Sequence, residues 1–482
     1  MKARALLLAV PVGLAAVVAC SSDETADPPL LTREALLDPA TCKQCHADHY
    51  REWSGSMHAY AAEDPVFLAM NKRGQRETNG ALGDFCVKCH APIAVRDGLT
   101  KDGLNLDQLP AKVKGVTCYF CHSIEGVEGT HNAAVRTSGD LVMRGPFADP
   151  VANTAHKSTY SPLHDRDKLE SSDTCGGCHD IVNGHGAALE RTFVEWKESV
   201  FAKAPGGATC SQCHMAQSTN LEPVAQAPNV RARRRHAHSF AAIDTALTPF
   251  PEADAQKKEI QALLDTTLQS ALCVSPVAGQ IRVMLDNVAA GHSFPSGATQ
   301  DRRAWVELVA YAGGQIVYQT GATDTPVSKS PDPDIWLMRE CMFDDKGAEV
   351  HMFWEGVTLE SNALPGQATF DTTDPRFYQT HLVQKFPRTG RITGAIDRVT
   401  MRVRVQPVGF DVLDELVASG DLDPSVKGAM PTFDVGAPLE WTAASGGEAY
   451  TDEALPYTCI TKTGFAIQAD KVPAPMRTRC AP

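Results

Sequence analysis

Short runs that alternate apolar and polar residues fill the second half of the chain and predict β-strands. Glycine, aspartate and asparagine residues separate these runs, as expected of turns between strands. Gly313-Gly314 lies between two runs and is typical of a hairpin turn. We therefore expect a β-sandwich-like domain over residues 255–482. The predicted strands begin at Gln280, Trp305, Gln315, Val350 and Val399.

The first half shows little strand periodicity, and its helical pattern is confined to short segments. Residues 48–64 predict a helix with Tyr50, Trp53 and Met57 along one side. A second short helix, residues 251–264, is expected to link the two halves of the chain. These patterns predict a multidomain protein, with a mainly α and irregular N-terminal domain over residues 42–254.

The N-terminus has the three parts of an export signal. Lys2 and Arg4 precede an apolar stretch over residues 5–19, which is too short to cross a bilayer. Cys20 follows directly, as in bacterial lipoprotein signals, where the cysteine is lipidated and becomes the first residue. Val17 stands where such signals usually have leucine, so ordinary cleavage beside Cys20 is the alternative. We expect a signal peptide at 1–19 and a flexible tether at 20–41.

Cysteine spacing adds chemistry to this outline. Ten of the 15 cysteines form five copies of C-x-x-C-H, the attachment motif of c-type haem. Two thiols at this spacing reach both vinyl groups of one porphyrin, and the adjacent imidazole binds the iron. A zinc ribbon does not need a histidine after each C-x-x-C, and a redox dithiol would occur once. The cysteine pairs are Cys42 and Cys45, Cys86 and Cys89, Cys118 and Cys121, Cys175 and Cys178, and Cys210 and Cys213, followed by His46, His90, His122, His179 and His214.

All five motifs lie between residues 42 and 214, and this density has a consequence for the core. It leaves about 35 residues for each haem, too few to enclose each one in a conventional apolar core. We therefore expect the five covalently bound haems to form the interior of the N-terminal domain and to lie close together. Haem c is attached outside the cytoplasm, which agrees with the export signal.

Other histidines are candidates for the second axial position of each iron. The chain has 16 histidines, so spare imidazoles outnumber the haems and all five irons could carry two of them. His58 lies near the end of the predicted helix and could reach a neighbouring haem, with Met57 as the competing ligand. His49 is expected at the surface. The predicted second ligands are His58, His156, His164, His238 and His292.

The reasons for the remaining candidates differ. His156 and His164 lie in a long aperiodic loop that a ligand role would order, and His131 and His185 are weaker candidates of the same kind. His292 lies in a loop with glycine and proline on both sides, which suits a rigidly presented ligand. The alternative for His292 is a hydrogen bond to Asp301 or to the backbone.

One basic run, residues 231–235, immediately precedes His236 and His238. Its arginines could simply be solvated. The sharper interpretation is that the guanidinium groups pair with haem propionates while His238 binds iron, and His236 is the weaker ligand candidate.

These residues resemble a known family, the multihaem c-type cytochromes related to the nitrification tetrahaem cytochrome and to octahaem hydroxylamine-oxidising cytochromes. The resemblance covers roughly residues 40–300. It implies that His58, which follows Trp-x-x-Ser, binds iron. The haem count differs from both relatives, so their ligand pairing does not carry over. The matching segments are Tyr50, Trp53 and Ser56-x-His58-Ala59, Gly115-Val116-Thr117-Cys118, Cys175-Gly-Gly-Cys178-His179, Thr192-Phe193-x-Glu195-Trp196 and Gly291-His292-x-Phe294-Pro295.

Four cysteines remain outside the motifs and the signal: Cys273, Cys341, Cys459 and Cys480. They could form two disulfides with three possible connectivities, and we favour Cys459–Cys480. His351 and His381 are expected to be structural. The net charge of −13 argues against a nucleic-acid partner.

The sequence therefore favours an exported electron carrier that serves redox partner proteins, on the periplasmic side of a bacterial membrane or as an outer-membrane lipoprotein. The alternative is an oxidoreductase that acts on a small nitrogen or sulfur compound at one open haem. That haem would be sought first at the second motif, because residues 91–117 contain no histidine or methionine. A third alternative is a binding module in the β-domain served by a haem relay.

The lipid anchor can be tested by changing one residue. Cys20→Ser should release the protein from the membrane fraction, because the acyl chains attach to this thiol. Fractionation of cells that express either form, followed by immunoblotting, measures the change. An unchanged distribution would favour ordinary cleavage and a free periplasmic protein.

Overall fold

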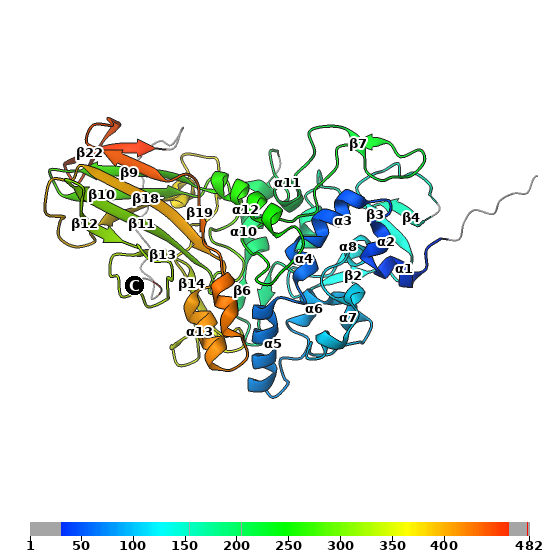
Figure 1. Ribbon diagram of the computed structural model, residues 1–482. Coiled ribbons are helices and arrows are strands. Elements are labelled where there is room, and N and C mark those ends of the chain that lie inside the picture. The colour runs from blue at the N-terminus through cyan, green and yellow to red at the C-terminus, as the bar shows by residue number, and fades with distance from the viewer. Residues whose placement is uncertain (1–29, 154, 204, 462–479, 481–482) are drawn as a thin grey trace, which may run out of the picture.

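The computed structural model describes residues 30–153, 155–203, 205–461 and 480, and it has a helical half and a strand-rich half (Figure 1). The predicted signal peptide and Cys20 lie outside these described residues. Among the described residues, no helix combines the length and the apolar character that crossing a membrane requires.

Short helices carry the C-x-x-C-H motifs in the first half. Thr117 and Thr209 accept hydrogen bonds from backbone N–H groups at the start of α8 and α11, so both helices begin at the first motif cysteine. The α-helices are α1 (Arg33–Leu37), α2 (Pro39–Cys42), α3 (Ala47–Ser54), α4 (Met57–Tyr60), α5 (Pro65–Glu77), α6 (Val87–His90), α7 (Pro92–Arg96), α8 (Cys118–Ser123), α9 (Ser171–Gly176), α10 (Thr192–Glu198), α11 (Cys210–His214), α12 (Ala253–Thr267) and α13 (Phe410–Ala418).

Two helical predictions need correction. The predicted tether is too long, because α1 and α2 form within it and bury Leu36 and Leu37. The predicted helix over residues 48–64 is broken into α3 and α4 at Gly55, where a Cβ would lie 2.5 Å from the Glu252 side chain. Ser56 then caps α4. The linking helix predicted at residues 251–264 is confirmed as α12.

Four small two-stranded sheets interrupt the helical half. Three are antiparallel (β1–β2, β5–β6 and β7–β8), and β3–β4 is parallel. Their strands are β1 (Ile124–Val127), β2 (Val135–Thr137), β3 (Val142–Gly145), β4 (Lys157–Tyr160), β5 (Ile181–Val182), β6 (Ala188–Glu190), β7 (Glu222–Pro223) and β8 (Ala232–Arg233).

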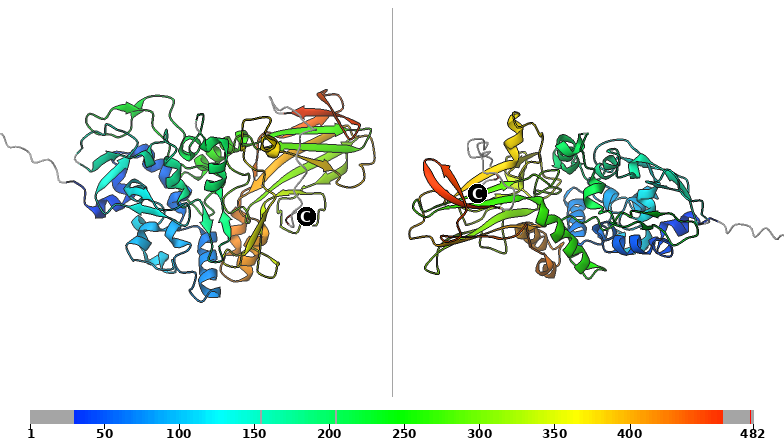
Figure 2. Two further views of the ribbon diagram at one scale, coloured as in Figure 1. Left: turned by 180° about the vertical axis from the view of Figure 1, so that it is seen from behind. Right: turned by 90° about the horizontal axis from the view of Figure 1, so that it is seen from above.

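The strand-rich half contains two larger antiparallel sheets that share one apolar core (Figure 2). One sheet has the order β17-β10-β9-β22-β21, and the other has β12-β11-β18-β19, with β13 beside β11 and β20 beside β18. The strands are β9 (Gln269–Ser275), β10 (Gln280–Asp286), β11 (Arg303–Ala312), β12 (Gln315–Thr320), β13 (Trp336–Met338), β17 (His381–Phe386), β18 (Arg398–Gln406), β19 (Phe433–Asp434), β20 (Leu439–Thr442), β21 (Glu448–Asp452) and β22 (Leu455–Thr461).

Alternating residues of these strands meet in the core. Leu272 and Ile281 of the first sheet pack in one buried cluster with Val306 and Val403 of the second. Four predicted strands and the Gly313-Gly314 hairpin are confirmed as β10, β11, β12 and β18.

The remaining predicted strand, which was expected to begin at Val350, is wrong over most of its length. A third small sheet has the order β15-β14-β16, and β15 ends at Val350, where the predicted strand was to begin. Met352 instead turns away and is buried against α5 and α13. The strands of this sheet are β14 (Glu340–Phe343), β15 (Glu349–Val350) and β16 (Thr358–Ser361).

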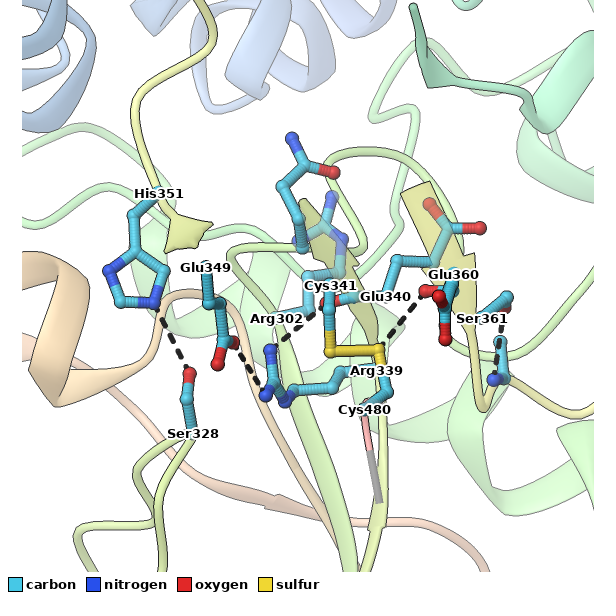
Figure 3. Close-up of a disulfide and its surroundings, with 12 residues drawn as sticks. Arg302, Ser328, Arg339, Glu340, Cys341, Glu349, His351, Glu360, Ser361 and Cys480 are labelled. Atoms are coloured by element: carbon cyan, nitrogen blue, oxygen red, sulfur yellow. Dashed lines mark hydrogen bonds and ion pairs between the residues drawn. A yellow bond between two sulfur atoms is a disulfide. The ribbon is translucent and has the colours of Figure 1, made fainter. Parts of the chain in front are cut away.

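The predicted Cys459–Cys480 disulfide is wrong. Cys273 on β9 lies directly opposite Cys459 on β22, and the two form a disulfide. Cys480 instead pairs with Cys341 on β14, beside the Arg339–Glu349 ion pair (Figure 3). Proximity in sequence favoured the wrong pair, because strand register brings together cysteines that are 186 residues apart.

Helices α5 and α13 join the two halves of the molecule (Figure 1). Met70 of α5 packs in one buried cluster with Leu413 and Leu416 of α13. Ion pairs flank this contact, with Arg73 3.1 Å from Glu415 and Arg76 2.6 Å from Asp421. The apolar faces of both helices are therefore buried only when the halves are docked.

Buried carboxyl groups also gather where the halves meet. Arg302 donates two hydrogen bonds, of 2.8 and 3.0 Å, to Asp244. Asp301 and Glu190, at the end of β6, lie near the same guanidinium group. Burial raises the pKa of both carboxyls to about 7, and the neighbouring carboxylates, including Asp180, add to the effect on Glu190.

This cluster predicts a pH-dependent cost to the folded state. Because the pKa is raised, ionisation of Glu190 lowers the free energy of unfolding. This loss of stability is absent below the ordinary pKa of a glutamate and complete above about pH 7. Glu190→Gln should therefore raise the apparent melting temperature at about pH 8 and leave it nearly unchanged at about pH 5. Glu198→Gln, at an exposed position on α10, is the control. Equal shifts at both pH values would contradict the assignment.

Candidate haem-binding sites

All ten motif cysteines are free thiols, and a short helix contains or adjoins each motif. Four of the five motif histidines donate their Nδ1 proton to a backbone carbonyl from another segment. The distances are 3.0 Å from His46 to Val224, 2.7 Å from His90 to Ala61, 2.5 Å from His122 to Arg144 and 2.8 Å from His214 to Ala241. Such a bond fixes the tautomer and leaves Nε2 free to bind a metal.

Burial keeps most of these imidazoles neutral. It lowers the pKa of His90, His179 and His214, and it lowers the pKa of His122 to about 3. Neutral imidazole is the form that binds iron, so no proton must be displaced at these positions.

Three motif histidines face a predicted second ligand at a diagnostic distance. Metal–imidazole bonds of about 2 Å place the ring centres of two imidazoles on opposite sides of one metal roughly 6 Å apart. The ring centres are 6.4 Å apart for His46 and His156, 6.1 Å for His179 and His58, and 6.4 Å for His214 and His292. The donor set therefore fits a group with iron held between two imidazoles.

The third motif has two predicted ligands beside it. The ring of His238 lies 6.5 Å from that of His122, and the ring of His164 lies 5.6 Å away. His238 uses Nδ1 to donate to the His236 carbonyl, which leaves Nε2 free. His164 uses Nε2 to donate to the Cys121 carbonyl, and its buried Nδ1 has no partner. His238 thus has the separation and the free nitrogen that ligation requires.

The second motif differs from the other four. The His90 ring stacks on Phe67 of α5, with ring centres 3.9 Å apart and planes 4° from parallel. In the part of the chain that the structure describes, no second histidine ring makes contact with His90. Four of the five predicted second ligands therefore face four motif histidines, and the fifth, His164, lies beside the third motif as well.

His49 was expected at the surface, and this prediction is wrong. Its ring packs edge-on against His238 at 4.7 Å and lies 5.7 Å from His46. Burial lowers its pKa to about 2. Its position one helical turn after His46 brings its ring towards the same motif.

The remaining histidines contact backbone or polar side chains. His131 and His185 are exposed, and His236 contacts Gln217. His351 and His381 hydrogen bond Glu415 and Asp286, in agreement with structural roles.

The basic run forms ion pairs with carboxylates of the protein. Arg231 and Arg233 form ion pairs with Asp149. Arg235 forms ion pairs with Glu52 and Glu222, and Glu52 also accepts the backbone N–H of His238 at 2.9 Å. The run therefore fixes the segment that carries His238.

Thiols of different motifs lie against one another. The pKa of Cys118 is raised first by the neighbouring Cys42 thiol, that of Cys89 by Cys178 and that of Cys175 by Cys210. Cys121 of the third motif is close to Cys178 of the fourth. Each motif thus has a direct neighbour, and the contacts connect all five.

Comparisons with known proteins bear on the family and on the fold. Residues 41–123 match the family model of cytochrome c554 and c-prime. The fold is similar to that of a penta-haem cytochrome c552 from Thermochromatium tepidum, with a TM-score of 0.57 and 21% identity over 86% of this chain and 98% of that chain. Among curated proteins the comparison finds no match. The five motifs, the family match and the shared fold together support a multihaem c-type cytochrome with covalently bound haem.

Proposed function

We propose that the protein is an exported pentahaem c-type cytochrome that carries electrons in periplasmic or cell-surface respiration. The observation that carries this proposal is the pairing of four motif histidines with a second imidazole at ring distances of 6.1 to 6.5 Å. Haem iron held by two imidazoles supplies one-electron transfer without an open position for substrate. Iron with no position open to substrate at four motifs favours an electron carrier over an enzyme.

The contacts between motif thiols support a continuous route. The first motif touches the third, the third approaches the fourth, and the fourth touches both the second and the fifth. Haems attached at these thiols would be close neighbours. Burial of the imidazoles and their bonds to backbone carbonyls hold the ligands rigid, which limits rearrangement during transfer.

Other parts of the proposal rest on the sequence. The export signal and Cys20 favour a lipid-anchored protein that serves redox partner proteins outside the cytoplasm. The shared core of the two large sheets favours a β-sandwich as the frame that presents His292. The segments around His58 and Glu195 resemble those of the nitrification and hydroxylamine-oxidising cytochromes, which favours kinship with them.

A second candidate function is reduction or oxidation of a small nitrogen or sulfur compound at the second motif. The observation that favours it is the absence of a histidine ring beside His90 within the described residues. Phe67 occupies the face of that imidazole and fixes its plane. An exchangeable position on this iron would accept a small ligand.

Mass and ligand binding test the proposal. The intact mass should exceed that of the mature chain by five porphyrins, because each motif offers two free thiols. The reduced protein should bind about one equivalent of carbon monoxide, at the second motif. His58→Ala should raise this to about two, because the fourth motif then loses its second imidazole.

Turnover separates the two candidate functions. A carrier should be reduced and reoxidised by a redox protein and show no steady turnover of nitrite or hydroxylamine. Fewer than five porphyrins would overturn the haem count. Turnover that carbon monoxide inhibits would favour the second candidate and reverse our ranking.

A further inference from the structure

Helix α10, in the helical half, forms hydrogen bonds to the loop of the strand-rich half that carries His292. Glu195 Oε2 accepts hydrogen bonds from the Ser293 backbone N–H at 3.2 Å and from the Ser296 hydroxyl at 2.7 Å. Thr192 Oγ1 accepts the backbone N–H of Gly297 at 2.9 Å. Two side chains one turn apart on a single helix therefore hold both ends of the segment that follows His292.

The helix itself is fixed to the haem motifs. Phe193 lies under Gly176 of the fourth motif so closely that a Cβ there would approach its ring to 2.3 Å. Trp196 donates its indole N–H to the Ala208 carbonyl at 2.8 Å, just before the fifth motif. The position of α10 is thus determined by both neighbouring motifs.

The strand-rich half holds the same loop from the other side. Asn287 donates to the His292 carbonyl at 2.8 Å, and Phe294 exchanges two backbone hydrogen bonds with Leu364. A Cβ on Gly366 would lie 3.1 Å from the His292 backbone, so little space remains there. The His292 backbone is therefore held between two elements.

The imidazole that results has a defined direction. His292 donates from Nδ1 to the Ser293 carbonyl at 2.8 Å, which leaves Nε2 free. Its ring is 12° from parallel with that of His214. The same residue, Ser293, thus orients the His292 ring through its carbonyl and binds Glu195 through its N–H.

We propose that Glu195, assisted by Thr192, is the positioning residue that sets His292 as the second axial ligand at the fifth motif. This inference rests on the proposed binding of haem at that motif. One side-chain oxygen of Glu195 accepts from both the Ser293 N–H and the Ser296 hydroxyl, so it holds the loop at two points. Partners that orient a metal ligand also control how well it binds, and their loss commonly weakens the metal bond by about 10- to 100-fold.

The experiment compares Glu195→Ala, Glu195→Gln and His292→Ala in the full, haem-loaded chain. Glu195→Ala should keep five porphyrins by mass and lose the low-spin paramagnetic-resonance signal of one haem. It should also bind one more equivalent of carbon monoxide than the parent. Glu195→Gln keeps an oxygen acceptor and should restore the parent spectrum. Glu198→Ala, on the exposed face of α10, is the matched control and should change nothing.

The outcomes separate this inference from the proposed function. If His292→Ala loses the signal and Glu195→Ala does not, the positioning role is wrong and the ligand assignment stands. If neither variant changes the spectrum, His292 is not a ligand and the inference fails, while five porphyrins and the other signals still support the carrier. Should Glu195→Ala fail to accumulate, Ser296→Ala removes one of the same bonds, and a parent-like spectrum would overturn the inference.

Discussion

The hydrogen bond from an imidazole Nδ1 to a backbone carbonyl is the interaction on which this molecule depends. In four motifs the carbonyl comes from a different segment: Val224 for His46, Ala61 for His90, Arg144 for His122 and Ala241 for His214. Each motif therefore requires another part of the chain to be in place before its histidine is oriented. This requirement explains why long stretches without periodicity are nonetheless ordered.

The same constraint assigns a role to segments that sequence patterns left open. The basic run is an example, because Arg235 and Glu52 hold the backbone of His238. Helix α10 is another, since it lies between two motifs and contacts the His292 loop. Charged and polar side chains here mainly hold backbone in place, and imidazoles are the groups left to face the metal.

Local chemistry could be predicted from the sequence, and long-range pairing could not. The C-x-x-C-H motifs and the strands at Gln280, Trp305 and Val399 depend on neighbouring residues, so their patterns are visible in the chain. The partners of Cys459 and His122 depend on strand register and on loop packing, which no local pattern records. The prediction for His49 failed for the same reason, because this residue is buried through its contact with His238, which is distant in the sequence. Candidate ligands could be named, but their assignment required the fold.

The contact between α5 and α13 has a consequence for how the molecule is assembled. Synthesis proceeds from the N-terminus, so all five motifs are made before α13 exists to cover Met70. Thioether bonds need only a local motif, whereas the imidazole of His292 and the apolar cover of α5 arrive later. Under the proposed function, haem attachment would take place on an incompletely packed chain, and ligation by His292 at the fifth motif would be a late step of maturation.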